Sequence, residues 1–145
     1  MKHLHLLALI AAISALPTAA TAQCRAFVKN KCAANMLPYK FNETFNAAQL
    51  GPGEEAEVDL TFFSGQDYRL MVCAHPIIGE VNWKLMDGTG QTLFESLASA
   101  PKPSFEFKVA TTQKLKVHID VPEDKSSATE MLNYGCVGIL VGFKE

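Results

Sequence analysis

The chain has 145 residues, of which 48% are hydrophobic and 19% are charged, and its formal net charge is −2. Because the charge is nearly balanced and no basic patch stands out, nucleic acid and anionic membrane surfaces are disfavoured as partners. The length suits one domain with a core between two layers of secondary structure.

Residues 1–22 have the features of a secretory signal peptide: Lys2 is a basic start, residues 6–16 form an apolar run, and Ala20-Thr21-Ala22 is a small-x-small cleavage sequence. The run is shorter than the roughly 20 residues that cross a bilayer, and no later segment is long enough, so we predict no membrane insertion. A buried N-terminal helix and a membrane anchor are the competing interpretations. Cleavage after Ala22 removes one basic residue, which takes the formal charge of the mature chain, residues 23–145, from −2 to −3. We expect that chain to be secreted or periplasmic.

The mature chain contains all four cysteines, Cys24, Cys32, Cys73 and Cys136. An even number of cysteines in an exported chain favours disulfides over free thiols. No two of them form a Cys-x-x-Cys pair, and the mature chain has two histidines, which argues against a zinc site. We therefore predict disulfides, no bound metal and no cofactor.

Residues 23–36 differ from the rest of the chain in their periodicity. Cys24, Phe27, Val28, Cys32 and Met36 follow one another at helical intervals, with charged and amide side chains on much of the opposite side. This pattern predicts an amphipathic helix of about three turns that ends before the next proline. A strand is the competing interpretation.

Residues 40–145 consist of short segments in which apolar and polar residues alternate, separated by turn residues such as Gly51-Pro52-Gly53 and Asp87-Gly88-Thr89-Gly90. A polar loop at 122–130 precedes the last segment. We predict an edge strand within 41–50 and strands at 56–62, 68–74, 81–86, 92–95, 105–109, 115–121 and 134–143. So many short strands predict an all-β fold, a single antiparallel β-sandwich of the jelly-roll type.

The last strand indicates where the helix packs. If Val137 and Ile139 face the core, then Cys136, Gly138 and Gly142 face outward. Glycines at alternate outward positions let another element approach the sheet closely. The same alternation places Cys73 on the outside of its strand. We therefore expect the N-terminal helix to lie on this outer sheet face, joined to it by disulfides.

The helix also limits the disulfide pairing. On a helix with a rise of 1.5 Å per residue, Cys24 and Cys32 would lie about 12 Å apart, which is beyond the reach of one disulfide. Both would then bond to cysteines elsewhere, although a bond between Cys73 and Cys136 across adjacent strands is the alternative. The sequence alone leaves three connectivities open.

Four segments, FFSGQDYRLMV, VNWKLMDGTGQTLF, FEFKVATTQKLKVHIDV and GCVGILVGF, carry a resemblance. Their pattern of Gly before Tyr-x-Leu, an aromatic strand leading to Asp-x-x-Gly, then Phe-x-Phe and a closing strand is similar to pre-peptidase C-terminal and Golgi-dynamics-like β-sandwiches. It also resembles secreted bacterial proteins of unknown function. The resemblance covers roughly residues 54–143. It implies a non-catalytic module that acts beside secreted enzymes or binds glycans or proteins.

The sequence shows no catalytic motif: it has no Gly-x-Ser-x-Gly elbow, no His-Glu-x-x-His and no P-loop. We interpret His118 as a solvated surface residue and His75, next to a proline, as part of a turn. Trp83 falls at an inward strand position and is expected in the core. The loop that begins at Asp87 is predicted to be a plain hairpin, because it lacks the acidic ligands of a calcium loop.

Three aromatic residues near the predicted edge strand, Tyr39, Phe41 and Phe45, form a weak candidate platform for a ligand; packing under the helix is the competing interpretation. Asn42 begins a glycosylation sequon that continues through Glu43 and Thr44.

These features together predict an exported, non-catalytic binding or accessory module for an unidentified protein or envelope partner. The alternative is a β-sandwich that binds a glycan or another small ligand. An enzyme is not expected. An apolar patch would favour the first interpretation, an exposed aromatic groove the second, and a histidine beside a carboxylate and a nucleophile in a cleft would favour an enzyme.

Overall fold

The computed structural model describes residues 19–42, 45–123 and 133–144. Most of the predicted signal peptide, residues 1–18, lies outside the described residues, so cleavage after Ala22 stays a prediction. Glu43 and Thr44 of the sequon and most of the predicted polar loop, residues 124–132, also lie outside them.

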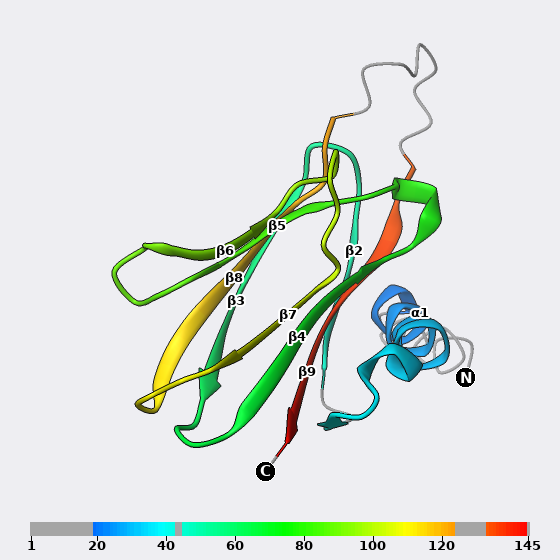
Figure 1. Ribbon diagram of the computed structural model, residues 1–145. Helices are drawn as coiled ribbons and strands as arrows, with labels where there is room; N and C mark the ends of the chain where they lie inside the picture. Colours follow the sequence, from blue (N-terminus) through cyan, green and yellow to red (C-terminus); the bar gives the residue numbers. More distant parts are fainter. Residues whose placement is uncertain (1–18, 43–44, 124–132, 145) are drawn as a thin grey trace, which may run out of the picture.

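Nine strands are described, and all their pairings are antiparallel (Figure 1). The bounds are β1 Lys40–Phe41, β2 Asn46–Leu50, β3 Glu55–Phe62, β4 Asp67–Ala74, β5 Asn82–Met86, β6 Thr92–Ser96, β7 Ser104–Lys108, β8 Gln113–Asp120 and β9 Gly135–Lys144. One sheet has the order β1-β9-β4-β7, with β2 also pairing with β9, and the other has the order β3-β8-β5-β6. From β2 onward, this is the strand order of a jelly roll. The predicted fold class is confirmed.

The main core lies between the two sheets, where the inward rows of alternating strands meet. Phe62, Leu70, Leu85 and Val117 are completely buried there. Burial of each such side chain contributes about 1.5–3 kcal/mol. Trp83 is also in this core, and its indole N–H donates a hydrogen bond to the backbone carbonyl of Lys102 at 3.1 Å. The core interpretation of Trp83 is confirmed.

The N-terminal helical segment lies on the outer face of the first sheet (Figure 1). It consists of α1, Ala19–Phe27, followed by one turn of π-helix, Val28–Cys32, and one turn of 3₁₀-helix, Ala33–Met36. The end at Met36 agrees with the prediction for 23–36, and the segment stops before the cis peptide bond that precedes Pro38. The helix begins before Gln23, within the predicted signal peptide.

Two glycines of β9 make the close approach of the helix possible. A Cβ atom on Gly138 would collide with the side chain of Val28, and one on Gly142 would lie 2.6 Å from Cε of Met36. Val28 and Met36 are fully buried, and with Leu140 of β9 they belong to a second apolar cluster between helix and sheet. The outward glycines that the sequence singled out are thus the contact points of the helix.

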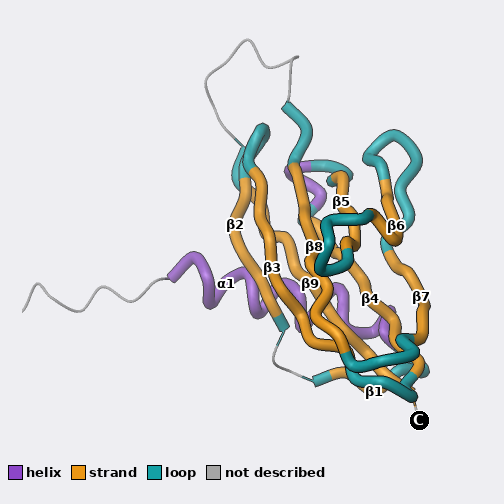
Figure 2. Tube along the Cα trace, turned by 90° about the vertical axis from the view of Figure 1, so that its left-hand side faces the viewer, coloured by secondary structure: helices purple, strands orange, loops and turns teal. Residues whose placement is uncertain are grey.

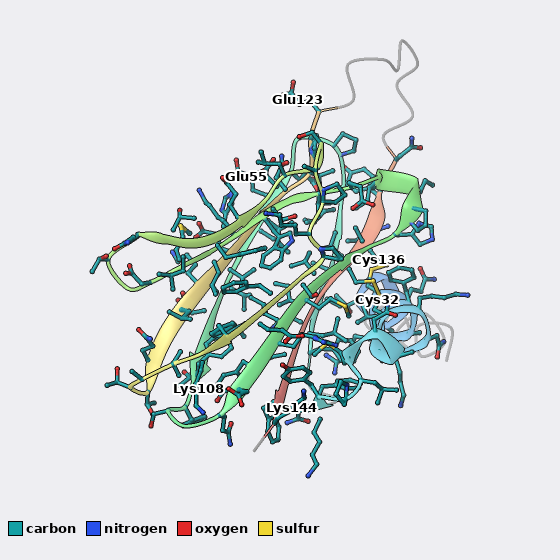
Figure 3. The ribbon with its side chains drawn as sticks, in the orientation of Figure 1. Cys32, Glu55, Lys108, Glu123, Cys136 and Lys144 are labelled. Carbon is teal, nitrogen blue, oxygen red and sulfur yellow. A yellow bond between two sulfur atoms is a disulfide. The ribbon has the colours of Figure 1, made fainter. Side chains whose placement is uncertain are left out.

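Two disulfides fasten the helical segment to the sheet (Figure 3). Cys24 bonds to Cys136 and Cys32 bonds to Cys73, with sequence separations of 112 and 41 residues. The helical cysteines therefore bond to the two cysteines that alternation places on the outer face, and the alternative bond between Cys73 and Cys136 is not formed. Each bond constrains the unfolded chain and contributes about 2–4 kcal/mol to stability.

The edge strand expected within 41–50 is divided into two. β1 pairs with Gly142 and Phe143 of β9, whereas β2 pairs with β9 from Ile139 back to Gly135. Phe45, the residue before β2, is buried in the apolar cluster under the helix. The structure corrects the prediction of one continuous strand at this position.

Candidate binding cleft

At one edge of the sandwich β2 and β3 run next to each other (Figure 2), and residues of both strands line a cleft. β2 is an edge strand of the first sheet, beside β9, and β3 is the edge strand of the second sheet, beside β8. Between these two strands a cleft leads from the surface to the core. We call it the edge cleft.

The upper part of the edge cleft has a volume of about 200 Å³ and an apolar lining. Its walls are short side chains, Ala48 of β2 and Ala56 and Val58 of β3, and core residues such as Ile119 and Ile139 form its floor. Short side chains leave space here that larger ones would fill. This part of the cleft offers contact area to apolar groups.

The lower part has a volume of about 300 Å³ and a more aromatic lining. Phe63, which is 59% exposed, stands at its rim close to the turn between β3 and β4. Asn46 and Ile139 line both parts, so the two parts lie next to each other along the edge.

The inward side chains of β3 are less covered than those of its neighbour β8. Val58 and Leu60 are half-buried, whereas Val117 and Leu115, their partners in register on β8, are fully buried. The inward row of β3 is therefore a part of the core that solvent can reach. Burial of such a row by a ligand would be favourable by about 25 cal/mol for each Å² of apolar surface.

The outward side chains of β3 are acidic: Glu55, Glu57 and Asp59 follow one another at alternate positions. Glu57 also lines the upper cleft. Its carboxylate accepts a hydrogen bond from Nζ of Lys116 at 3.1 Å and lies 3.1 Å from Nδ1 of His118. These contacts hold the pKa of Glu57 below its ordinary value, and the hydrogen bond from Lys116 has the larger effect. Glu57 therefore places one ionised carboxylate, paired with Lys116, at the lining of the upper cleft.

His118 is less exposed than the sequence suggested. Its side chain retains 15% of its accessible surface and lies between Glu57 and Glu55, whose Oε2 is 3.9 Å from Nε2 of His118. The predicted solvated position is therefore corrected to a mostly covered one, with carboxylates of the neighbouring strand beside the ring. The hydrogen bond and ion pairs found for His118 are to carboxylates, and none is to a hydroxyl or thiol nucleophile in the described part of the chain.

The two predicted turns have the structures that the sequence indicates. Nδ1 of His75 accepts a hydrogen bond from the backbone N–H of Ile77 at 3.2 Å and caps the short 3₁₀-helix Pro76–Ile78. Oδ1 of Asp87 accepts hydrogen bonds from the hydroxyl and the backbone N–H of Thr89, at 2.7 and 2.8 Å. The carboxylate of Asp87 is thus used within its own hairpin.

Two of the three predicted platform residues are buried. Tyr39 is buried, and its ring centre lies 4.6 Å from the guanidinium of Arg69 and 4.2 Å from Nζ of Lys144. Its hydroxyl donates a hydrogen bond to Glu106 at 2.9 Å. Phe45 is buried under the helix, although it also lines the lower cleft. The three residues therefore form no open platform.

Phe41 is half-buried and packs against the helix cluster. Packing under the helix, the competing interpretation, describes Phe41 and Phe45. Tyr39 is covered instead by Arg69 and Lys144. The residues of β3 that line the cleft were missed by the sequence analysis, since Ala56 and Val58 have the alternation of any half-buried strand.

Within 19–42, 45–123 and 133–144, no group of three or more His, Cys, Asp or Glu side chains is arranged to hold a metal ion. In the same residues no helix has the length and apolar character needed to cross a bilayer.

The fold and the cleft together define a jelly-roll sandwich with a disulfide-fastened helix on one face and one open edge. No family model matches the chain, and no curated protein matches it. Among solved structures it is similar to PliG of Aeromonas hydrophila, a periplasmic inhibitor of g-type lysozyme, with a TM-score of 0.45, 11% identity and coverage of 72% of this chain and 92% of that chain. It is also similar to the carbohydrate-binding module CBM36 in complex with calcium and xylotriose, with a TM-score of 0.33, 10% identity and coverage of 74% and 94%. This level of likeness carries no information about the ligand of this chain.

Proposed function

We propose that this protein is an exported, non-catalytic binding module that holds an apolar segment of a protein partner in the edge cleft. The observation that carries the proposal is the half-covered inward row of β3, Ala56, Val58 and Leu60. These side chains continue the core to the surface, and a bound apolar segment would complete their burial.

The lining favours a protein partner over a sugar. Among the residues that line the upper cleft, Asn46 and Glu57 are the polar ones. Sugar recognition needs several converging hydrogen-bonding groups, and those groups are few here. A glycan is the second candidate because the lower cleft combines the exposed ring of Phe63 with the amides of Asn42 and Gln66 at its rim.

The covalent structure fits the proposed compartment. Two disulfides persist in an oxidising environment, such as the periplasm or the outside of a cell. Together with the predicted signal peptide, they support a secreted or periplasmic location. An accessory role beside secreted enzymes, as the resemblance implies, is part of this proposal.

Site-specific photo-crosslinking tests the proposed function. A photoreactive phenylalanine analogue replaces Val58 in the cleft or, as a matched control, Leu93, an exposed apolar residue on β6 at the opposite edge. The mature, oxidised protein is then irradiated in an envelope extract. We expect a protein adduct of one defined mass from position 58 and none from position 93.

A second variant distinguishes the two candidates. Val58→Arg places a charge in the apolar part of the cleft and should abolish crosslinking from a probe at position 60. Crosslinking that is equal from positions 58 and 93 would contradict the proposal. A thermal shift with a defined oligosaccharide that Val58→Arg removes would establish the glycan module instead.

A further inference from the structure

β3 has one free edge along its whole length of eight residues. It pairs with β8 on one side, and on the other side no strand of the described chain pairs with it. Backbone N–H and C=O groups on such an edge can form hydrogen bonds with an added strand. The free edge lies along the edge cleft, so a strand added here would also cover the cleft.

β8 shows which sequence β3 accepts as a neighbour. Val117 of β8 lies opposite Val58, and Lys116 lies opposite Asp59, in the antiparallel register. Most of β8, whose sequence is QKLKVHID, alternates in this way: Leu115, Val117 and Ile119 face the core, and Lys116 and His118 lie opposite Asp59 and Glu57. At the end of the strand the pattern changes, because Asp120 lies opposite Glu55. Because β3 presents the same two rows to both of its sides, a strand on the free edge meets the same requirements.

We propose that the partner binds as an extended strand added to the free edge of β3, and that this strand alternates apolar and basic residues. Its apolar side chains enter the edge cleft and cover Ala56 and Val58. Its basic side chains lie opposite Glu55, Glu57 and Asp59, and its backbone continues the sheet. This inference rests on the proposed function and specifies the mode of binding and the chemistry of the partner.

The charge of β3 favours this occupant over a second copy of the chain. Antiparallel pairing of two β3 strands would place acidic residues opposite acidic residues, and like charges directly opposite each other are destabilising. β8 of a second copy is already paired on both sides, with β3 and β5, and cannot serve as the added strand. Charge complementarity therefore points to a basic segment of a different protein.

Synthetic peptides test the alternation and the charge. The probe is a blocked peptide, Lys-Leu-Lys-Val-Lys-Ile-Lys-Leu, added to the mature, oxidised protein. The first control has the same composition with the apolar residues grouped together, and the second has glutamate in place of lysine. We expect the alternating basic peptide to bind at least tenfold more tightly than either control, by fluorescence anisotropy, and to slow amide hydrogen exchange in β3.

A charge-reversed protein provides the decisive variant. The double variant Glu55→Lys/Asp59→Lys should prefer the glutamate peptide, while Glu57 keeps its contacts with Lys116 and His118. Glu80→Lys/Glu95→Lys changes the net charge equally, away from the cleft, and should keep the original preference. Circular dichroism and thermal melting of all variants show whether they are folded.

Three results would overturn the inference: no binding of the basic peptide, equal binding of the alternating and grouped peptides, or a dimer of the free protein that disappears with Val58→Arg. In any of these cases, crosslinking from position 58 to an envelope protein would leave the proposed function intact. Loss of that crosslinking as well would contradict both.

Discussion

The two edges of the sandwich differ in how they are closed. At the edge formed by β6 and β7, the rings of Phe94 and Phe105 stack with their centres 4.3 Å apart, and Phe107 follows at 5.4 Å from Phe105. Trp83 lies 4.8 Å from Phe94 and connects this stack to the core. Aromatic rings therefore bridge the two sheets on this side.

The edge formed by β2 and β3 occupies the corresponding position on the other side of the sandwich and is open. Its inward residues include Ala48, Ala56 and Val58, which are too short to bridge the sheets. An aromatic residue buries about 150–250 Å², whereas these residues offer much less. The comparison indicates that short inward side chains leave the upper part of this edge open, whereas aromatic rings close the other edge.

Of the changes considered, reduction of the disulfides should produce the largest difference in stability between the two edges. The helix that the disulfides hold packs against Phe45 and Ala47, next to the cleft, and the aromatic edge lies on the other side. Reduction removes about 2–4 kcal/mol for each bond. We expect helix signal and cleft binding to be lost at lower denaturant than the fluorescence of Trp83, the single tryptophan. Coincident melts of reduced and oxidised protein would contradict this expectation.

Truncation of one residue at each edge compares them directly. Phe105→Ala removes a ring from the stack and should lower the free energy of unfolding by about 2 kcal/mol, less than for a fully buried phenylalanine because Phe105 is half-buried. Val58→Ala, at the open edge, should cost less than about 1 kcal/mol. Urea unfolding measures both values. Equal losses would show that the two edges are packed alike.

The helix on the sheet was predictable because its determinants are local or covalent. The alternation of β9 reveals its outward face, and glycines at positions 138 and 142 mark where a second element can touch it. The cysteines then connect the two elements, since Cys24 and Cys32 are too far apart on a helix to bond to each other. Periodicity within one segment was sufficient for each of these steps.

The edge cleft was not predictable in the same way. Ala56 and Val58 have the pattern of any strand with one buried face, and their exposure depends on which strand lies next to them in space. The burial of Tyr39 likewise depends on Arg69 and Lys144, which are distant in the sequence. Contacts that depend on the order of strands in the sheets cannot be inferred from the pattern of residues within one segment.

Filling the cleft should make the open edge resemble the closed one. Ala56→Phe puts a ring into the upper part of the cleft, which Ala56 lines. We expect the stability to change by less than about 1 kcal/mol, because the ring enters open space instead of a packed core. Crosslinking from position 60 should be lost. Retained crosslinking would show that the partner binds outside the cleft.

Acid should weaken the open edge through the carboxylate of Glu57. The pKa of Glu57 is lowered in the folded protein, first by the hydrogen bond from Lys116 and then by that with His118. A carboxyl whose pKa is lower in the folded than in the unfolded protein stabilises the fold at pH values above the unfolded pKa, 4.5. This contribution is lost as the pH falls from 4.5 through the folded pKa. Glu57→Gln should therefore melt at a lower temperature than the parent at pH 6, and this difference should shrink at pH 3.

Glu106 and Asp87, whose pKa values are also lowered, titrate in both proteins, so the difference in melting temperature isolates Glu57. A constant difference across this pH range would mean that the charge of Glu57 does not stabilise the fold.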